Sequence, residues 1–526
     1  MPEVTNTLST NGNQAPSDLP SAEVYAVCGV EPEVQAYAMA KYSRSALSMK
    51  DSLKEISQQK AEKFLNTFYF QDGHRSIADL AHVALAIERL SILAAIAVAD
   101  EQRWDGQERS TRYQDFKKSG YFTPDFGDDQ QARSLYRETI DNLFSEYESL
   151  SERTFRYLLE ITAKPVDMKQ EAYERTLKAR AFDISRYLLP LSTNTSLGEI
   201  VNARTLETQV SRLLSHTHKE VRYLGELLKR AAVSPAYNAN QATLQELVER
   251  IRAVSPELGD RAAQELLRDV RVAPTLVKYA DPNSYEIETR RELRQIATEL
   301  LGNLEIVAPP TVDLLDEEPL EVELASTLIY ENSHYPYRQI RQAIEGAGDR
   351  IRREIIDLGL RHRGKHDEML RPFCAGQQFR FDILMEIGGF RDMHRHRRCI
   401  QIGQEFTTKH GYDVPDEVNA AGGRGTYDVV MRRTAGFVEE LSARSGAEAK
   451  ENAQYVIPLA FRKRTLFKMD FAEVVYISEL RTGPAGHFSY RNVAYAMYEA
   501  VARKYPALAK HIRVTDVREP VDLLKR

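Results

Sequence analysis

Helical periodicity dominates the pattern of apolar and polar positions in the first half of the chain. Apolar residues recur at helical spacing in three segments, residues 33–66, 129–163 and 224–303. We expect two helices in the first of these segments and a helix pair in the second. Residues 77–99 are almost continuously apolar, which predicts a buried helix or a strand followed by a helix. Residues 179–222 predict a short apolar strand, a polar turn at 192–195 and then a helix.

A similar order of elements recurs in the second half, beyond a join at 307–322 that is rich in proline and acidic residues. In order, we expect a helix over 337–360, a Phe-rich apolar segment over 373–390, a basic cluster, a Gly-rich loop over 421–425, a helix over 427–445 and a helix that ends at Arg481. Such a recurrence is the pattern that a duplicated fold produces.

Two short motifs also occur twice, in the same order. Residues 107–113 align with residues 404–410, and each copy has an amide, a carboxylate, hydroxyls and a cation in the same columns. A Gly-Tyr pair and a proline follow both copies. A Leu-Pro-Leu segment precedes Arg212, and an Ile-Pro-Leu segment precedes Arg481, with proline-to-arginine distances that differ by one residue. We therefore predict two copies of one fold in this chain.

The pattern divides the chain into four parts. These are a tail (1–21), a first repeat (22–234), a helical connector (235–320) and a second repeat (321–526). The tail is polar and has no apolar stretch of the kind found in a signal peptide, so we expect it to be disordered. No apolar run approaches the roughly 18 residues that a membrane span requires. We expect a cytoplasmic protein that does not enter membranes.

The amino-acid composition does not favour any one class of binding partner. The chain has 526 residues, of which 42% are hydrophobic and 28% charged, as is ordinary for a soluble globular protein. The net charge of −6 gives no overall attraction to nucleic acid or to an anionic membrane. Cys28, Cys374 and Cys399 are too widely spaced to indicate a disulfide framework or a zinc site. Any anion binding must come from local arginine clusters.

The strongest such cluster is the basic run from His394 to Arg398. Guanidinium groups are planar, bidentate donors that suit phosphate, imide or carboxylate edges. A histidine between two arginines would have its pKa lowered by the neighbouring positive charge. The plainer alternative is a solvated basic turn that pairs with acids on another helix. Contact with phosphate or RNA is a further alternative.

A second candidate lies in the first half, where Ser110 and Arg112 stand two residues apart. In an extended segment such residues lie on the same face, and a hydroxyl with a guanidinium forms a workable phosphate clamp. Glu108 could accept a hydrogen bond from a sugar hydroxyl or a ring N–H group. A salt bridge within the loop is the competing interpretation of these residues.

Taken as a series, these residues resemble the flavin-dependent thymidylate synthases. The first half matches the family at Gly73–Ser76, Glu108, Ser110–Tyr113, Arg186–Pro190, Asn202–Arg204, Arg212 and Glu220–Arg222, and the second half at Arg395–Arg397, Glu405, Thr407, Lys409, Val456–Pro458, Leu480–Arg481 and Ala485–Arg491. The resemblance covers roughly residues 25–230 and 325–515. It implies two α/β repeats, each a sheet with packed helices, that form a pseudo-twofold pair.

Each half departs from the family pattern in a different place. In the first half, residues 100–102 (Asp-Glu-Gln) stand where the family has Arg-His-Arg. In the second half, residues 470–472 (Asp-Phe-Ala) stand where it has Asn-Ala-Arg, and Gln454 stands where it has an arginine. The family builds its deoxyuridylate site across a subunit interface. The resemblance therefore implies that one composite site survives between the two repeats while its mirror site has decayed.

The resemblance implies methylation of dUMP to dTMP, with FAD as cofactor and with NADPH and methylene-tetrahydrofolate as co-substrates. It implies catalytic roles for Arg395 and Arg481, substrate binding by Glu108, Ser110, Arg112, Arg186 and Arg212, and cofactor binding by His74, Ser76, Asn202, Arg204, His396, Arg397 and Glu405. No metal and no nucleic acid are implied. Because the family forms tetramers, two chains of this protein would form the equivalent assembly, a homo-oligomer.

Two other interpretations stay open. The acidic residues at 100 and 101 favour a catalytically silent relative that binds nucleotide or flavin, or that only scaffolds a complex. The survival of opposite motifs in opposite repeats favours an active composite site, because unconstrained decay has no reason to be complementary. A nucleic-acid-binding protein is the third interpretation, and it conflicts with the negative net charge and the lack of aromatic residues among the basic runs.

Overall fold

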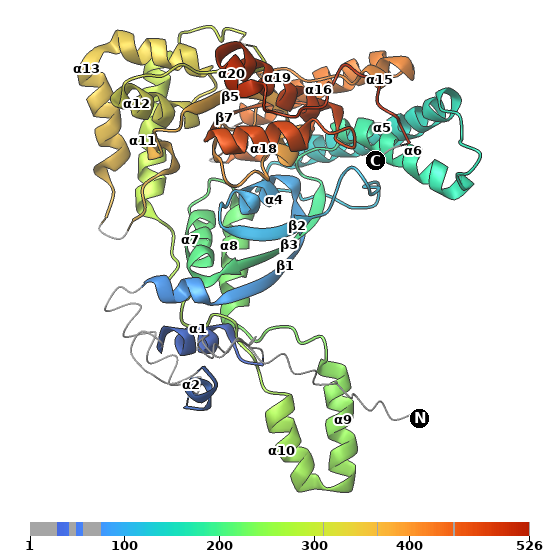
Figure 1. The fold of residues 1–526 in the computed structure, drawn as a ribbon, viewed down its shortest axis with the longest axis vertical. Helices are drawn as coiled ribbons and strands as arrows, with labels where there is room; N and C mark the ends of the chain where they lie inside the picture. Colours follow the sequence, from blue (N-terminus) through green and yellow to red (C-terminus); the bar gives the residue numbers. More distant parts are fainter. Residues whose placement is uncertain are drawn as a thin grey trace, which may run out of the picture.

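The computed structural model describes residues 29–41, 49–55, 75–308, 310–364, 367–444, 446 and 448–524. The predicted tail, Cys28 and His74 lie outside the described residues. The remainder forms two small antiparallel sheets surrounded by helices (Figure 1). The α/β class and the two-repeat arrangement predicted from the sequence are confirmed.

The first repeat is built on a three-stranded sheet in the order β1-β3-β2. Its elements are α1 (Pro32–Lys41), α2 (Met49–Glu55), η2 (Arg75–Leu80), β1 (His82–Ser91), α4 (Ile92–Ala99), β2 (Trp104–Glu108), α5 (Gln130–Ile161), α6 (Gln170–Ser185), η3 (Arg186–Leu188), β3 (Asn194–Asn202), α7 (Ala203–Leu214) and α8 (Lys219–Val233). The apolar segment 77–99 is thus a strand that continues into a helix, as one of the two predictions had it.

The second repeat has a four-stranded sheet in the order β4-β5-β7-β6, and its edge strand β4 comes from within the predicted connector (235–320) because it pairs with β5. Its elements are β4 (Val312–Leu314), α12 (Leu320–Glu331), α13 (Tyr337–Arg361), η4 (Arg371–Phe373), β5 (Phe379–Glu386), α14 (Ile387–Met393), β6 (Ile400–Gly403), α15 (Asp416–Ala420), α16 (Arg424–Ser442), α17 (Ala449–Gln454), β7 (Arg462–Met469), α18 (Phe471–Arg481), α19 (Phe488–Lys504) and α20 (Pro506–Ala509). Strands β5, β7 and β6 repeat the order of β1, β3 and β2.

Local details show that the two repeats share one register. Ser91 pairs with Asn194 in the first sheet, and Glu386 pairs with Arg462 in the second. Ser91 caps α4 with its hydroxyl, and Glu386 caps α14 with its longer carboxylate. The longer cap needs a glycine three residues on, because a Cβ at Gly389 would lie 2.4 Å from a Glu386 oxygen. The two strand–helix units are therefore equivalent positions with different side chains.

The two proline segments meet at the pseudo-twofold axis. Pro190 and Pro458 form an antiparallel bridge, and the Leu191 amide donates to the Ile457 carbonyl while the Leu459 amide donates to the Leu189 carbonyl. A single apolar core runs through this contact and includes residues of both sheets. The two repeats therefore share a hydrophobic core and form one structural unit.

Two predictions of secondary structure were wrong here. Residues 129–163 form the single helix α5, because no residue in the segment breaks the helical hydrogen bonding. The short apolar strand expected before the turn at 192–195 is the 3-10 turn η3 and the proline bridge, and the strand β3 follows the turn instead. The reason is tertiary, since the backbone around Pro190 bonds to the other repeat.

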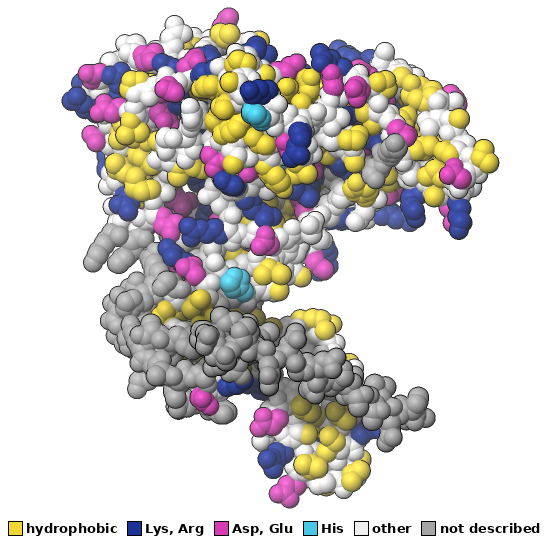
Figure 2. Space-filling model, in the orientation of Figure 1, with side chains coloured by type: hydrophobic (Ala, Val, Ile, Leu, Met, Phe, Trp, Pro, Cys, Tyr) yellow, Lys and Arg dark blue, Asp and Glu magenta, His cyan; other side chains and the backbone are white. Residues whose placement is uncertain are grey.

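The connector contributes α9 (Gln241–Val254), α10 (Pro256–Leu266) and α11 (Ser284–Leu301). Helices α9 and α10 form a hairpin that projects from the body, whereas α11 packs on α13 (Figure 1). The hairpin buries little, and its Leu247, Val254 and Leu258 are exposed. Figure 2 shows hydrophobic and charged side chains next to one another on this projecting part. In the part of the chain described here, no helix has the length and apolar character that a membrane crossing needs.

Candidate functional site

Four of the predicted arginines, two from each repeat, surround one carboxylate, that of Asp392. Burial raises the pKa of Asp392, but the positive charges of Arg186, Arg112, Arg395 and Arg481 outweigh burial and hold the pKa below its usual range. Arg186 is nearest, with its Nη1 atom 3.6 Å from Oδ2 of Asp392. The structure thus brings together residues that lie up to about 370 positions apart in the chain, at the interface between the repeats.

Three of these four arginines lie at or next to the end of a helix. Arg186 is the first residue of η3, Arg395 follows α14, and Arg481 is the last residue of α18. An arginine at the end of a helix also interacts favourably with the helix dipole. Arg112 lies in the loop after β2. Contacts with neighbouring side chains hold Arg112, Arg186 and Arg481 in position, whereas Arg395 is exposed.

Arg112 and Arg481 are held by the same tyrosine. Arg112 donates to the Tyr490 hydroxyl over 3.1 Å, and the Arg481 guanidinium lies 5.4 Å from the centre of the Tyr490 ring. Arg112 also forms a bidentate ion pair with Asp183, at 2.8 and 3.3 Å. This pairing raises the pKa of Arg112 despite burial, so its positive charge is permanent.

The contacts of His396, between Arg395 and Arg397, define its tautomer. Burial lowers the pKa of His396, which keeps the ring neutral near pH 7. Its Nε2 atom accepts from Arg481 Nε over 2.7 Å, so its Nδ1 carries the proton and donates to Glu473 over 3.2 Å. His396 therefore positions Arg481 and does not face the arginine cluster as a cation.

Glu108 and Arg395 line one small pocket, and Ser110 lies beside the backbone of Arg112. Glu108 forms an ion pair with Arg391, and both line a small pocket of about 30 Å³ together with Arg395. The Arg112 amide donates to the Ser110 hydroxyl over 3.2 Å. Arg395 is exposed, and no described residue forms a hydrogen bond or ion pair with its side chain. The positively charged Arg395 side chain is thus open to solvent, whereas Arg112 and Arg186 are buried.

Arg186 has bonding capacity that the protein does not use. Its side chain is 2% exposed, and within the described residues its Nε and Nη2 atoms have no hydrogen-bond partner. A buried guanidinium with unmet donors is costly, unless an acceptor such as a phosphate or carboxylate oxygen completes it. The cluster can therefore bind an anion.

The predicted cofactor residues divide between two other places. The Arg397 guanidinium lies 4.4 Å from the centre of the Trp104 ring and contacts Asp105. Asn202 caps α7, and Arg204 pairs with Asp79 of η2, the short helix that also contains Ser76. Trp104 is the register partner of Val201, next to Asn202, so the two groups lie at one end of the β2–β3 pair.

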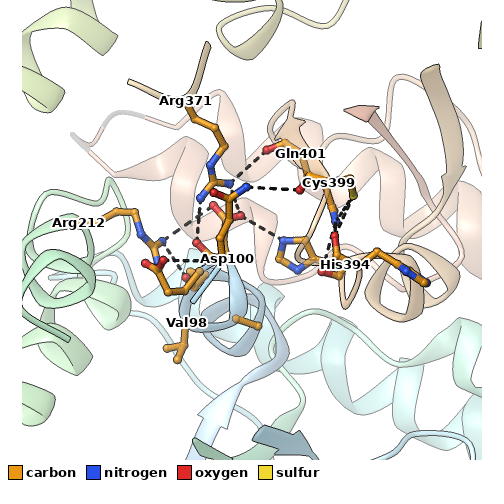
Figure 3. A network of polar contacts seen from close by, with 12 residues as sticks. Val98, Asp100, Arg212, Arg371, His394, Cys399 and Gln401 are labelled. Atoms are coloured by element: carbon orange, nitrogen blue, oxygen red, sulfur yellow. Dashed lines mark hydrogen bonds and ion pairs between the residues drawn. The ribbon is translucent and has the colours of Figure 1, made fainter. Parts of the chain in front are cut away.

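Arg212 and Glu405 do not join the arginine cluster. Both line a cavity of about 760 Å³ at the pseudo-symmetric position between the repeats. In this cavity the Asp100 carboxylate contacts three basic side chains (Figure 3). It accepts hydrogen bonds from Arg371 over 2.5 Å and from His394 over 3.2 Å, and the Arg212 guanidinium lies 4.0 Å away. Burial raises the pKa of Asp100, but these three groups hold it well below its usual range. Asp100 is thus ionised and neutralised by cations from both repeats.

Sequence reasoning missed the partners of the predicted site residues, which are Asp392, Asp183 and Tyr490 for the arginines and Arg391 for Glu108. One signal was present for Asp392, because an acid three residues before Arg395 lies about one helical turn away. Nothing in the sequence pairs Asp183 with Arg112, since their contact depends on how α6 packs beside the loop after β2.

Comparison with known proteins gives one family. The sequence model of the thymidylate synthase complementing protein family matches residues 29–236 and 317–507. These two matches coincide with the two repeats and leave the helical hairpin between them unmatched.

Individual relatives agree with this match. The chain is 26% identical to a "UPF0159 protein" of Chlamydia muridarum, over 94% of this chain and 92% of that one, and 24% identical to a "UPF0159 protein" of Thermoplasma acidophilum, over 91% and 94%. A flavin-dependent thymidylate synthase of Clostridium tetani is 25% identical over 33% of this chain and 67% of its own. The first two relatives therefore share the full two-repeat length.

Two solved structures are among those to which the chain is similar. The ThyX enzyme of Helicobacter pylori, in complex with FAD and dUMP, is 17% identical and covers 38% of this chain and 88% of its own, with a TM-score of 0.25. The UMP/dUMP methylase PolB of Streptomyces cacaoi, bound to 5-Br dUMP, is 18% identical over 38% and 84%, with a TM-score of 0.26.

Proposed function

Because this chain belongs to the thymidylate synthase complementing protein family, we propose that it methylates a pyrimidine nucleotide such as dUMP, with FAD, at one composite site between its repeats. The observation that carries this proposal is the convergence of two arginines from each repeat around Asp392. Such a cluster supplies fixed positive charge for a phosphate and for the polar edge of a pyrimidine. NADPH and methylene-tetrahydrofolate would be the co-substrates.

In this proposal each group has a separate task. Ser110, Arg112 and Arg186 bind the phosphate, where the unmet N–H groups of Arg186 find acceptors. Arg481, held in position by neutral His396, polarises the carbonyl edge of the pyrimidine ring. Exposed Arg395 closes over the ligand from the solvent side.

The residues around Trp104 fit one part of FAD. Arg397 offers a cation beside an aromatic ring, which suits a negatively charged, flat group. Asn202 and Arg204 stand at the same end of the sheet, within reach of the remainder of an extended dinucleotide. When bound, FAD would supply the reducing equivalents. Pairing of two chains, as in the family's tetramers, would enclose it further.

The test compares matched positions of the two repeats. Ser110→Ala and Arg395→Ala should each lower dUMP-dependent NADPH oxidation at least 100-fold. Thr407→Ala is the control for the first variant, because the Lys409 amide donates to the Thr407 hydroxyl over 3.2 Å, as the Arg112 amide does to Ser110. Thr407→Ala should change the rate less than twofold. Equal losses at Ser110 and Thr407 would contradict a single composite site.

A catalytically silent nucleotide-binding protein is the second candidate. It is favoured by the acids that already pair with the cluster, Asp183 with Arg112, Asp392 with Arg186 and Glu108 with Arg391. A purified protein that is colourless, yet binds dUMP in calorimetry and loses that binding in Arg395→Ala, would establish this candidate in place of the first.

A further inference from the structure

The cavity opposite the arginine cluster has smaller or uncharged side chains at two matched positions. By the shared register of α4 and α14, Ala97 stands where the second repeat has Asp392. Gln454 lines the cavity, and by the aligned proline segments it stands where the first repeat has Arg186. A methyl group and an amide thus replace a carboxylate and a guanidinium. The volume of about 760 Å³ is within the range of small-molecule and cofactor sites, roughly 300–1,000 Å³.

The acids of the cavity are mostly neutralised by cations of the protein itself. Asp100 pairs with Arg371, and Glu405 pairs with Arg294. Glu101 has the Arg212 guanidinium 3.9 Å away. Burial raises the pKa of Glu331, which favours its neutral form. A cationic ligand would therefore find few carboxylates without a partner.

Two donors, by contrast, are left over. Lys463 is buried on β7, and no described carboxylate lies within 4.0 Å of its Nζ atom, which donates to the Gln404 carbonyl. Burial lowers the pKa of Lys463 to about 8, so it still carries a proton at neutral pH. Within the described residues, the Nε and Nη2 atoms of Arg212 are buried and have no hydrogen-bond partner. Arg212 is already shared between Asp100 and Glu101, at 4.0 and 3.9 Å, so its charge is balanced and only these N–H groups are free. Lys463 has no such carboxylate, and a buried cation without one calls for an anionic ligand.

Aromatic rings stand beside the lysine. Its Nζ atom is 4.2 Å from the centre of the Phe406 ring and 5.4 Å from that of Phe390. Phe390 in turn stacks on His394, with ring centres 5.0 Å apart and planes 28° apart. All four side chains line the cavity. Flat apolar walls next to a cation suit a ring that bears a negative group.

We propose that this cavity is a second ligand site, separate from the arginine cluster, for an aromatic carboxylate. Its carboxylate pairs with Lys463, and its ring lies against Phe406. The proposal does not depend on the reaction at the arginine cluster. Loss of the arginines that suit a phosphate, together with gain of a buried lysine, indicates a ligand of different chemistry from a nucleotide.

Anthranilate, a fluorescent aromatic carboxylate, is the probe, and 2-aminobenzamide is its neutral comparator. In fluorescence titrations of the full chain, anthranilate should bind at least tenfold more tightly than the amide. Lys463→Met removes the charge but keeps the length, and should abolish this preference, whereas Lys463→Arg should retain it. Lys409→Met is the matched control, because Lys409 is an exposed lysine nearby, and it should leave the preference unchanged.

Three results would overturn the proposal: equal binding of the two probes, an unchanged preference in Lys463→Met, or displacement of anthranilate by dUMP or FAD. If the Lys463 variants fail to fold, protection of the native protein decides the question. Anthranilate should slow acetylation of Lys463, read by peptide mass spectrometry, and leave Lys409 unaffected. Absence of protection contradicts the site. Arg395→Ala should keep the anthranilate affinity within twofold, even if the protein proves to have no dUMP-dependent activity.

Discussion

The arginine cluster and the opposite cavity occupy equivalent positions in the two repeats, yet one is filled with paired charges and the other is open. Asp392 lies near four guanidinium groups and pairs with that of Arg186, whereas Ala97 stands at the matching position. In the cavity, Arg371 of η4 pairs with Asp100 and neutralises it. The difference shows that a shared backbone does not impose shared chemistry, because a few substitutions decide whether an interface packs or opens.

The largest effect should come from breaking the buried pair at the filled position. Arg186→Met leaves Asp392 buried beside one cation fewer, and loss of one partner of a buried pair costs about 3–5 kcal/mol. Gln454→Met, the change at the open position, should cost less than about 1 kcal/mol. Urea unfolding monitored by circular dichroism measures both values. Equal losses would mean that the two positions are energetically alike, contrary to the comparison.

The free energy of unfolding should fall by about 3 kcal/mol with rising pH because of Glu199. Glu199 lies on β3, where the second repeat has Phe467. Burial raises the pKa of Glu199 to about 7. The unfolded chain therefore loses this proton at lower pH than the folded chain does. The contribution of Glu199 is fully present below about pH 4.5 and is lost as the pH rises to about 7.

Glu199→Gln should remove this decline, and the free energy of unfolding of the variant should fall less between pH 4.5 and 7 than that of the wild type. Urea titrations at each pH measure the slope. An unchanged slope would show that Glu199 is as well solvated as an ordinary surface carboxyl group.

A smaller effect, about tenfold, should follow Asp392→Asn. The change keeps the shape but removes the negative charge that competes with a phosphate for the arginines. The affinity for dUMP should rise about tenfold, or about 1.4 kcal/mol, and that for deoxyuridine should change less than twofold. Isothermal titration calorimetry of both ligands checks this. A parallel change for the two ligands would place the phosphate elsewhere.

The smallest effect should come from the α9–α10 hairpin. Replacement of residues 238–269 by a short Gly-Ser linker should leave dUMP and anthranilate affinities within twofold, because neither site includes residues of these helices. A larger change in either affinity would mean that the hairpin acts on the interface between the repeats. The same two titrations supply the measurement.

Much of this arrangement could be predicted from the sequence, and the rest depended on tertiary contacts. Repeated motifs at Arg212 and Arg481 gave the duplication, and the helix end at Arg481 followed from local pattern. The residues that pair with these side chains could not be predicted from the sequence. Asp183 reaches Arg112, and Arg371 reaches Asp100, only because distant segments pack together. The strand after residue 193 was misplaced for a similar reason, since Pro190 bonds across the pseudo-twofold axis.

The bridge between Pro190 and Pro458 has a genetic consequence. In a pair of identical subunits, each codon change appears twice, once on either side of the axis. In this chain the two sides are encoded separately, so a substitution on one side is never imposed on the other. Selection can hold one interface pocket constant while the opposite pocket varies freely.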